Sequence, residues 1–294
     1  MGQKDISQKA LESYNDVFAD IVNGIIFKGK DTVKAEDLEE ASTLSVFSKD
    51  SKLHEQSRDV AKFWKENNIR VAFVGIENQT KSDKYMPLRL MAYDGACYKR
   101  QLIDIDRAVK DSKAEKIKPY PVISLVIYFG EKSWNSSKSL LESVSVRPEL
   151  RPFVNDYKPN LVEITGLSEE EIEHFTSDFR SLIDIVRLQY DPAYKVSDRV
   201  IDHKQEFAWA ASSILGDAKI MDICNFENED VEGEGLTVCK LVDRLEEEGE
   251  VKGQIKLLAS LINDGTLTLK QAAEKMSMTV AKFKATAKKL GICL

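Results

Sequence analysis

Residues 69–79, I-R-V-A-F-V-G-I-E-N-Q, constrain the fold more than any other stretch of this sequence. Most of them are apolar, and their β-branched and aromatic side chains predict a β-strand. The stretch ends in Glu77, Asn78 and Gln79. Side chains alternate between the two faces of a strand, so Glu77 and Gln79 point to the same face. An apolar strand that ends in a carboxylate and an amide is typical of a site built on a rigid element.

The preceding residues predict a β-hairpin over residues 58–79. With a three-residue turn at 66–68, Asp59 lies opposite Gly75 and therefore on the same face as Glu77. Gly75 has no side chain, which leaves room at this point of the strand. A turn of four residues would instead direct Asp59 to the other face. The pattern thus predicts that the carboxylates of Asp59 and Glu77 share one face of the hairpin, provided that the turn has three residues.

The rest of the first half predicts a mixed α/β fold. The apolar pattern indicates a helix over residues 6–27, and a second helix follows over residues 81–103. The near-continuous apolar run at 120–129 is typical of a central strand covered on both faces, and residues 160–164 predict one more strand. Two polar stretches are predicted as irregular: residues 31–57, with a short helix at 34–41, and residues 104–118, as a loop or a frayed helix.

The second half predicts helices. They run from the capping box at residues 168–171, over 177–190 and 196–215, and over 236–264 after an acidic linker at 222–235. Residues 268–289 predict a helix-turn-helix. The sequence therefore divides into an α/β unit at 1–190, a helical and acidic linker region at 191–235, and a helical tail at 236–294.

Charge and cysteine content limit the class of protein. The 294 residues carry a net charge of −7, which argues against a generic nucleic-acid binder. The acidity is local, because residues 222–250 hold 11 acidic and 2 basic residues, whereas residues 1–118 hold 20 and 21. The first part can therefore still present a basic groove. Four dispersed cysteines indicate free thiols in a reducing cytosol, and we expect a cytoplasmic protein without a membrane segment or a secretory signal.

The carboxylate pair suggests metal chemistry. Asp59 and Glu77 can hold Mg²⁺, with the main-chain carbonyl of Asn78 as a further ligand. Such an ion lowers the pKa of a bound water and polarises a phosphodiester oxygen. Gln79 can orient the attacking water. An acid of the first helix, Asp16 or Asp20, can complete the set of ligands. The alternative is that Asp59 and Glu77 are ordinary solvated or salt-bridged acids.

Two other groups have competing interpretations. Arg89, Tyr93 and Arg100 share one helix face, which is either a phosphate clamp or a solvated surface. The heptad-like pattern of residues 238–262 indicates either a homo-oligomer contact or part of the core. The terminal helix pair is likewise a packing or oligomerisation element, or a reader of DNA.

Four motifs in this order resemble a known family. They are R-D-V-A-K-F-W at 58–64, G-I-E-N-Q at 75–79, M-P-L-R-L-M-A-Y-D at 86–94 and Y-P-V-I-S-L-V-I-Y-F-G at 120–130. Together with N-D-V-F at 15–18, they are similar to the Rpn-type recombination-promoting nucleases, also called putative transposases, of the PD-(D/E)xK nuclease superfamily. The resemblance covers roughly residues 10–185.

This resemblance implies a restriction-endonuclease-like core, in which a mixed sheet of four or five strands is flanked by helices. The predicted helical tail is then an all-helical C-terminal extension. It also implies Mg²⁺-dependent cleavage of DNA. Asp59 matches the strand aspartate, Glu77 matches the acid of the E-x-K element, and Asp16 is preferred to Asp20 as the helix acid. Gln79 stands where the superfamily has a lysine, so this chain lacks a positive charge at that position.

The sequence therefore predicts a cytoplasmic Mg²⁺-dependent DNA endonuclease. Asp16, Asp59, Glu77 and Gln79 are the predicted catalytic residues, while Arg89 and Tyr93 are predicted to contact the DNA. The alternative is a protein with an inactive nuclease core that binds DNA or assembles into oligomers through its helical tail.

Overall fold

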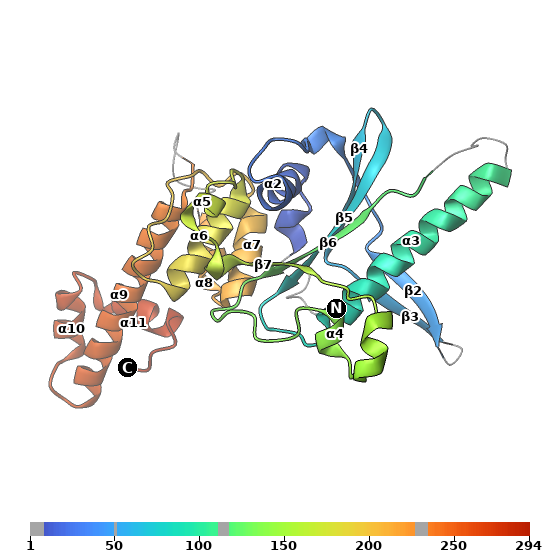
Figure 1. Cartoon of the computed structure of the whole chain (residues 1–294). Helices are drawn as coiled ribbons and strands as arrows, with labels where there is room; N and C mark the ends of the chain where they lie inside the picture. Colours follow the sequence, from blue (N-terminus) through green and yellow to red (C-terminus); the bar gives the residue numbers. More distant parts are fainter. Residues whose placement is uncertain (1–8, 50–51, 111–117, 227–234) are drawn as a thin grey trace.

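The computed structural model describes residues 9–49, 52–110, 118–226 and 235–294 of the chain. A mixed β-sheet with helices on both faces forms the first half, and the second half is built from helices (Figure 1). This arrangement confirms the predicted fold class.

The central sheet has five strands in the order β1-β4-β5-β6-β7. The first three are antiparallel neighbours, whereas β5, β6 and β7 run parallel. The predicted hairpin and the two predicted strands are confirmed as β4–β5, β6 and β7. The strands are β1 (Leu38–Glu40), β4 (Val60–Glu66), β5 (Ile69–Gln79), β6 (Val122–Tyr128) and β7 (Asn160–Glu163).

The turn of the β4–β5 hairpin has two residues rather than the predicted three. Asn67 and Asn68 have φ angles of 51° and 65°, and Glu66 pairs with Ile69. Two residues with positive φ form the turn that matches the twist of a hairpin, and asparagine tolerates this conformation better than most residues. The prediction was wrong because it assigned Glu66 to the turn.

A β-bulge returns Asp59 to the predicted face, although the predicted pairing was wrong, because Gly75 lies opposite Ala61 rather than Asp59. Lys65 pairs with Arg70 but Trp64 pairs with Ala72, so Val71 is left over on β5. The extra residue shifts the register by one. Val60 consequently pairs with Ile76, and Asp59 follows beside the end of β5.

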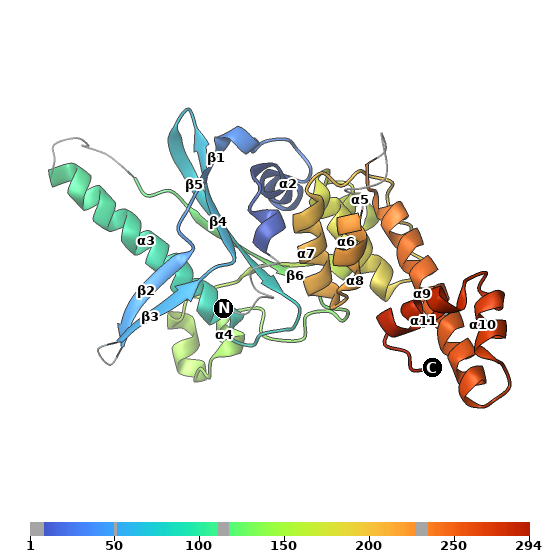
Figure 2. The same cartoon turned by 180° about the vertical axis from the view of Figure 1, so that it is seen from behind.

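The two faces of the sheet are covered by different helices (Figures 1 and 2). Helix α2 (Asn15–Ile26) packs on the face that presents Val74 and Ile76, together with the helices of the second half. Helix α3 (Met86–Lys110) covers the other face, where it forms a smaller cluster with side chains of β6. β5 lies in the middle of the sheet, and near its C-terminal end Ile76 faces the core on the α2 side while Glu77 contacts Arg89 of α3.

Several predicted boundaries differ from the structure. Residues 31–57, predicted as irregular, contain β1 and a separate two-stranded sheet of β2 (Leu44–Lys49) and β3 (Lys52–Ser57). Helix α3 continues to Lys110, through part of the predicted loop. The first predicted helix is split, because residues 9–12 are helical and α2 starts only at Asn15. The smaller elements are η1 (Ala35–Asp37), α4 (Leu140–Ser143), η2 (Pro148–Phe153) and η3 (Ile164–Gly166).

The helices of the second half form two groups. The helices within residues 169–226 pack into the main core together with the first part of α9, whose Leu241 is fully buried there. The second part of α9 packs with the last two helices in a separate cluster around Ile255. The heptad positions of α9 are thus covered within the chain at both ends. The helices are α5 (Glu169–Ile172), α6 (Asp178–Tyr190), α7 (Lys204–Leu215), α8 (Lys219–Phe226), α9 (Val238–Asn263), α10 (Leu269–Lys275) and α11 (Val280–Lys289).

Among the described helices, none has the length and apolar character needed to span a lipid bilayer.

Candidate metal centre at the end of strand β5

The end of β5 sends neighbouring side chains to opposite faces of the sheet. Glu77 pairs in register with Val126 of β6 and lies on the α3 face, whereas Asn78 pairs with Ile127 and lies on the α2 face. Because the sheet ends here, Arg89 of α3 and Glu12, from the helical residues before α2, reach the same strand end. The site is therefore assembled around the strand end rather than on one face.

Glu77 is a buried acid with only one of its oxygens bonded. Its side chain is 4% exposed, and Arg89 of α3 donates to Oε1. Among the described residues, Oε2 has no hydrogen-bond partner. Burial, and then the charge of Asp59, raise the pKa of Glu77 to about 7, although Arg89 acts in the opposite direction. A buried carboxylate oxygen without a donor is costly, so it indicates a place for a bound cation or proton.

Asp59 is fixed at the same strand end. Its Oδ2 accepts a hydrogen bond of 2.7 Å from the main-chain N–H of Asn78. The ammonium group of Lys9 lies 3.0 Å from Oδ1. The charge of Asp59 acts on Glu77 and contributes to its raised pKa, so the two acids lie near one another, and their predicted role as a metal-binding pair stays a prediction.

Glu12 is a third acid, which sequence reasoning missed. The side-chain amide of Asn78 donates to its Oε2 at 2.7 Å, and Glu12 is only 1% exposed. Burial, and to a smaller extent the charge of Asp59, raise the pKa of Glu12 to about 8. The signal in the sequence was a glutamate directly after the apolar Leu11, in the helical residues that precede α2.

The two helix acids that the sequence favoured lie elsewhere. Asp16 is bonded to His203, with 2.9 Å between Oδ2 and Nε2, and its side chain is 54% exposed. Asp20 accepts hydrogen bonds from the main-chain N–H groups of Thr176 and Ser177, just before α6. The structure thus does not bring Asp16 or Asp20 to Glu77, and the acid that reaches the end of β5 is Glu12, through its hydrogen bond with Asn78.

The predicted DNA-contacting residues of α3 also differ from one another. Arg89 lies at the site, bonded to Glu77 and, at 3.0 Å, to Asp83. Tyr93 is 4% exposed and packs in the hydrophobic cluster under α3, so it lies beneath the surface. Arg100 is largely exposed and pairs with Asp104.

The space predicted above Gly75 is filled by a side chain. A Cβ atom at Gly75 would lie 2.7 Å from the guanidinium of Arg58. Gln79 is half-buried at the last position of β5, where its carbonyl accepts a hydrogen bond of 2.8 Å from Phe129.

The donor atoms suit a hard divalent cation, although two of them are engaged by protein cations. In the described part of the chain, no three carboxylate, imidazole or thiol side chains converge as ligands of one ion. Lys9 and Arg89 instead neutralise Asp59 and Glu77. Two buried oxygens, Oε2 of Glu77 and Oδ1 of Asn78, are without a partner among the described residues. Carboxylate and amide oxygens are the donors that Mg²⁺ prefers, so these two atoms fit the ion by their chemistry.

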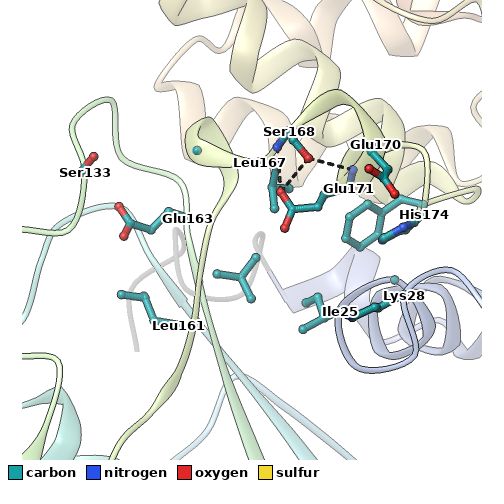
Figure 3. Close-up of a pocket in the computed structure, with 14 residues that line it drawn as sticks. Ile25, Lys28, Ser133, Leu161, Glu163, Leu167, Ser168, Glu170, Glu171 and His174 are labelled. Atoms are coloured by element: carbon teal, nitrogen blue, oxygen red, sulfur yellow. Dashed lines mark hydrogen bonds between the residues drawn. The ribbon is translucent and has the colours of Figure 1, made fainter.

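A cleft of about 680 Å³ lies apart from these acids, between α2, β7 and α5 (Figure 3). Two of its three acids have structural roles. Glu163 accepts a hydrogen bond of 2.6 Å from the N–H of Trp134, and Glu171 closes the capping box with Ser168. The geometry of this cleft therefore offers no set of reactive groups comparable to the end of β5.

Residues 50–191 match the protein family described as putative transposase, YhgA-like. This match confirms the resemblance carried by the sequence motifs, and it includes Asp59, Glu77 and Arg89. Glu12 and the helical tail lie outside the matched residues. No curated protein and no solved structure matches the chain.

Proposed function

We propose that this protein is a metal-dependent DNA endonuclease, because residues 50–191 match the family of YhgA-like putative transposases. The observation that carries the proposal is the unpartnered Oε2 of buried Glu77, next to Asp59 at the end of β5. Each of the two acids has one protein cation beside it, but Oε2 of Glu77 has no partner among the described residues, and the charge of Asp59 acts against that of Glu77. The two acids provide the charge that a divalent cation requires.

In this proposal Asp59, Glu77 and the main-chain carbonyl of Asn78 hold Mg²⁺, and Glu12 replaces Asp16 as the acid from the helical segment. Bound Mg²⁺ would supply a water of lowered pKa and would polarise a phosphodiester oxygen. Asn78 positions the site, since its main-chain N–H holds Asp59 and its side chain holds Glu12.

Gln79 and Arg89 act on water and DNA in this proposal. Gln79, with its amide on the Glu77 face, orients the attacking water. The guanidinium of Arg89, once released from Glu77, pairs with a backbone phosphate. Tyr93 supports α3 from beneath at this point, and its predicted contact with DNA requires the helix to move. The place of action that we propose is the cytoplasm.

Cleavage of supercoiled plasmid in Mg²⁺ tests the proposal. We expect Glu77→Gln and Asp59→Asn each to lower the nicking rate at least about 100-fold, because each removes a ligand charge. Asp104→Asn, an exposed acid of the same protein, serves as the control and should cleave as the wild type does. Equal cleavage by wild type, Glu77→Gln and Asp59→Asn would remove the basis of the assignment.

The same assay decides which helix acid takes part. If Glu12 is the third acid, Glu12→Gln loses activity and Asp16→Asn retains it. The reverse result would restore Asp16 and would require the N-terminal residues to rearrange on metal binding.

A second function is favoured by the ion pairs at the site. Lys9 and Arg89 already neutralise Asp59 and Glu77, and Gln79 lacks the usual charge. These features suit an inactive nuclease core in a protein that binds DNA or forms homo-oligomers through its helical tail. Wild-type protein that binds DNA but cleaves it with neither Mg²⁺ nor Mn²⁺ would support this second function over the first.

A further inference from the structure

The last 40 residues fold around a core of their own. The second part of α9 packs with α10 and α11, and the buried side chains at the centre are those of Ile255, Ala272, Ala273, Phe283 and Ala287. This cluster is separate from the main core, and both views place it at the opposite end of the molecule from α3 (Figures 1 and 2). The tail is thus a small trihelical unit attached through α9.

A tight turn sets the angle between α10 and α11. Ser277 has a φ of 53°, and the N–H of Met278 donates to the carbonyl of Ala273 at 2.9 Å, which ends α10 in the manner of a left-handed cap. The hydroxyl of Thr279 then accepts from the N–H of Lys282 and caps α11. Thr268 begins α10 with a full capping box. Two short capped helices joined by a four-residue turn form a helix-turn-helix, as the sequence predicted.

The exposed side of α11 is basic in an otherwise acidic chain. Residues 268–294 hold six lysines and one acid, Glu274, while the whole chain has a net charge of −7. Four of the lysines belong to α11, and all four are exposed: Lys282, Lys284, Lys288 and Lys289.

These lysines lie in two rows with a strip of small residues between them. At 100° per residue, Lys284 and Lys288 fall on one side of the helix and Lys282 and Lys289 on the other. Ala281 and Ala285 lie between the rows, opposite buried Phe283, and both are exposed. A helix with a narrow edge of small residues can come close to the bases in a groove of a nucleic-acid duplex. The lysines on either side of that edge can then reach the phosphates of both strands.

We propose that α11 docks in the major groove of duplex DNA and forms a second DNA-binding element, separate from the carboxylate site. The lysine rows contact the phosphates of the two strands, and the two alanines face the base edges. Alanine offers only apolar contact to a thymine methyl group, so this element provides affinity with little sequence preference. The inference adds to the proposed nuclease function but does not rest on it, because binding is measured without cleavage.

Fluorescence anisotropy of a labelled 20-bp duplex with full-length protein in EDTA tests the proposal between 50 and 200 mM KCl. The double variants Lys284→Ala/Lys288→Ala and Lys282→Ala/Lys289→Ala each remove two phosphate contacts. We expect each to weaken binding about tenfold at the lowest salt and to reduce the slope of log K against log[salt] by about 2. Circular dichroism verifies that both variants keep their helices.

Matched controls separate docking from general charge. Lys270→Ala/Lys275→Ala changes the charge of the tail equally but lies on α10, and Asp104→Asn changes an exposed acid outside both sites. We expect both to bind much more tightly than the α11 variants. Binding that is weakened equally by the α10 and α11 changes would overturn the proposal, and so would unchanged binding by both α11 variants.

Duplex RNA is the third arm of the test. Its deep and narrow major groove does not admit an α-helix, so it should compete poorly with the DNA. Competition as strong as that of duplex DNA would overturn docking in the groove. If cleavage fails while the salt and variant effects appear, the nuclease proposal fails and this one stands.

Discussion

Two buried acids lie on the α3 side of the sheet, Glu77 at the end of β5 and Asp94 on α3 itself. Asp94 has every oxygen satisfied. Its Oδ1 accepts hydrogen bonds from Arg58 and Ser124, both at 2.6 Å, and Tyr157 donates to Oδ2 at 2.5 Å. Glu77 has one arginine on one oxygen, and its other oxygen has no partner in the described part of the chain.

The difference separates a structural acid from a site acid. In a closed network every polar atom already has a partner, so no atom is left to bind a ligand. Removal of one member leaves the other members buried without a partner. An open carboxylate makes the free protein less stable than it could be, and this cost is offset only when something binds. The two groups meet in the sequence, because Arg58 belongs to the network of Asp94 and the next residue, Asp59, acts on Glu77.

The largest effect on stability is expected from opening the closed network. Asp94→Ala leaves the guanidinium of Arg58, whose side chain is 3% exposed, without its charge partner. We expect a loss of about 3–5 kcal/mol in the free energy of unfolding, measured with urea. Glu77→Gln should change it by less than about 1 kcal/mol or raise it, because it removes a buried charge. Similar losses in both variants would erase the distinction between the two acids.

The pH dependence of stability is the next largest effect. Burial raises the pKa of Glu77 to about 7 and that of Glu12 to about 8, so between pH 4.5 and these values the native state holds more protons than the unfolded state. The free energy of unfolding must therefore fall as pH rises through this window, by on the order of 1 kcal/mol per pH unit for each acid.

Urea titrations at several pH values measure this slope. Glu12→Gln/Glu77→Gln should remove most of it, whereas Asp94→Asn should leave it in place. A slope of the opposite sign in the wild type would mean that the acids are charged and well paired in the native state.

A smaller effect is expected from divalent cations. An ion that binds only the native state stabilises it, and a concentration ten times the dissociation constant contributes about 1.4 kcal/mol, or a rise in Tm of roughly 2–4 °C. Differential scanning fluorimetry with Mg²⁺ or Ca²⁺ should show this shift for the wild type and the Asp104→Asn control. Glu77→Gln and Asp59→Asn should show none. An equal shift in all four proteins would place the ion elsewhere.

The smallest effect is expected at an exposed acid. Asp16 pairs with His203 at the surface, and such pairs contribute at most about 1 kcal/mol. Asp16→Ala should therefore lower the free energy of unfolding by less than this amount at pH 6. A loss as large as that of Asp94→Ala would show that exposure does not distinguish the acids of this protein.

The sequence predicted best what depends on local periodicity. Alternating and apolar patterns placed β4, β5 and β6, and with them Asp59 and Glu77. The patterns failed for β1, which is three residues long and polar at Glu39 and Glu40. So short a strand is stabilised by its pairing with β4, and three residues are too few to show an alternating pattern of apolar side chains.

The site was predictable only as far as one hairpin defines it. Glu12 contacts Asn78 across 66 residues, and nothing in a local pattern says which acid of a helical stretch will face a distant strand end. Asp20 had the same residue type and a suitable spacing, yet its carboxylate caps the turn before α6. Long-range packing decides between such residues, and helical spacing alone does not contain that information.

The bulge at Val71 takes up the one extra residue of β5, so that Asp59 lies abreast of Glu77 beyond it. A deletion of Val71 would only remove the bulge, because Trp64 would still pair with Ala72 and the carboxylates would keep their places. A deletion of one paired residue of β4 between the bulge and Asp59, such as Lys62, would instead shift the pairing by one, and Ile76 rather than Glu77 would come abreast of Asp59. Such a deletion would direct the two carboxylates to opposite faces without altering either of them.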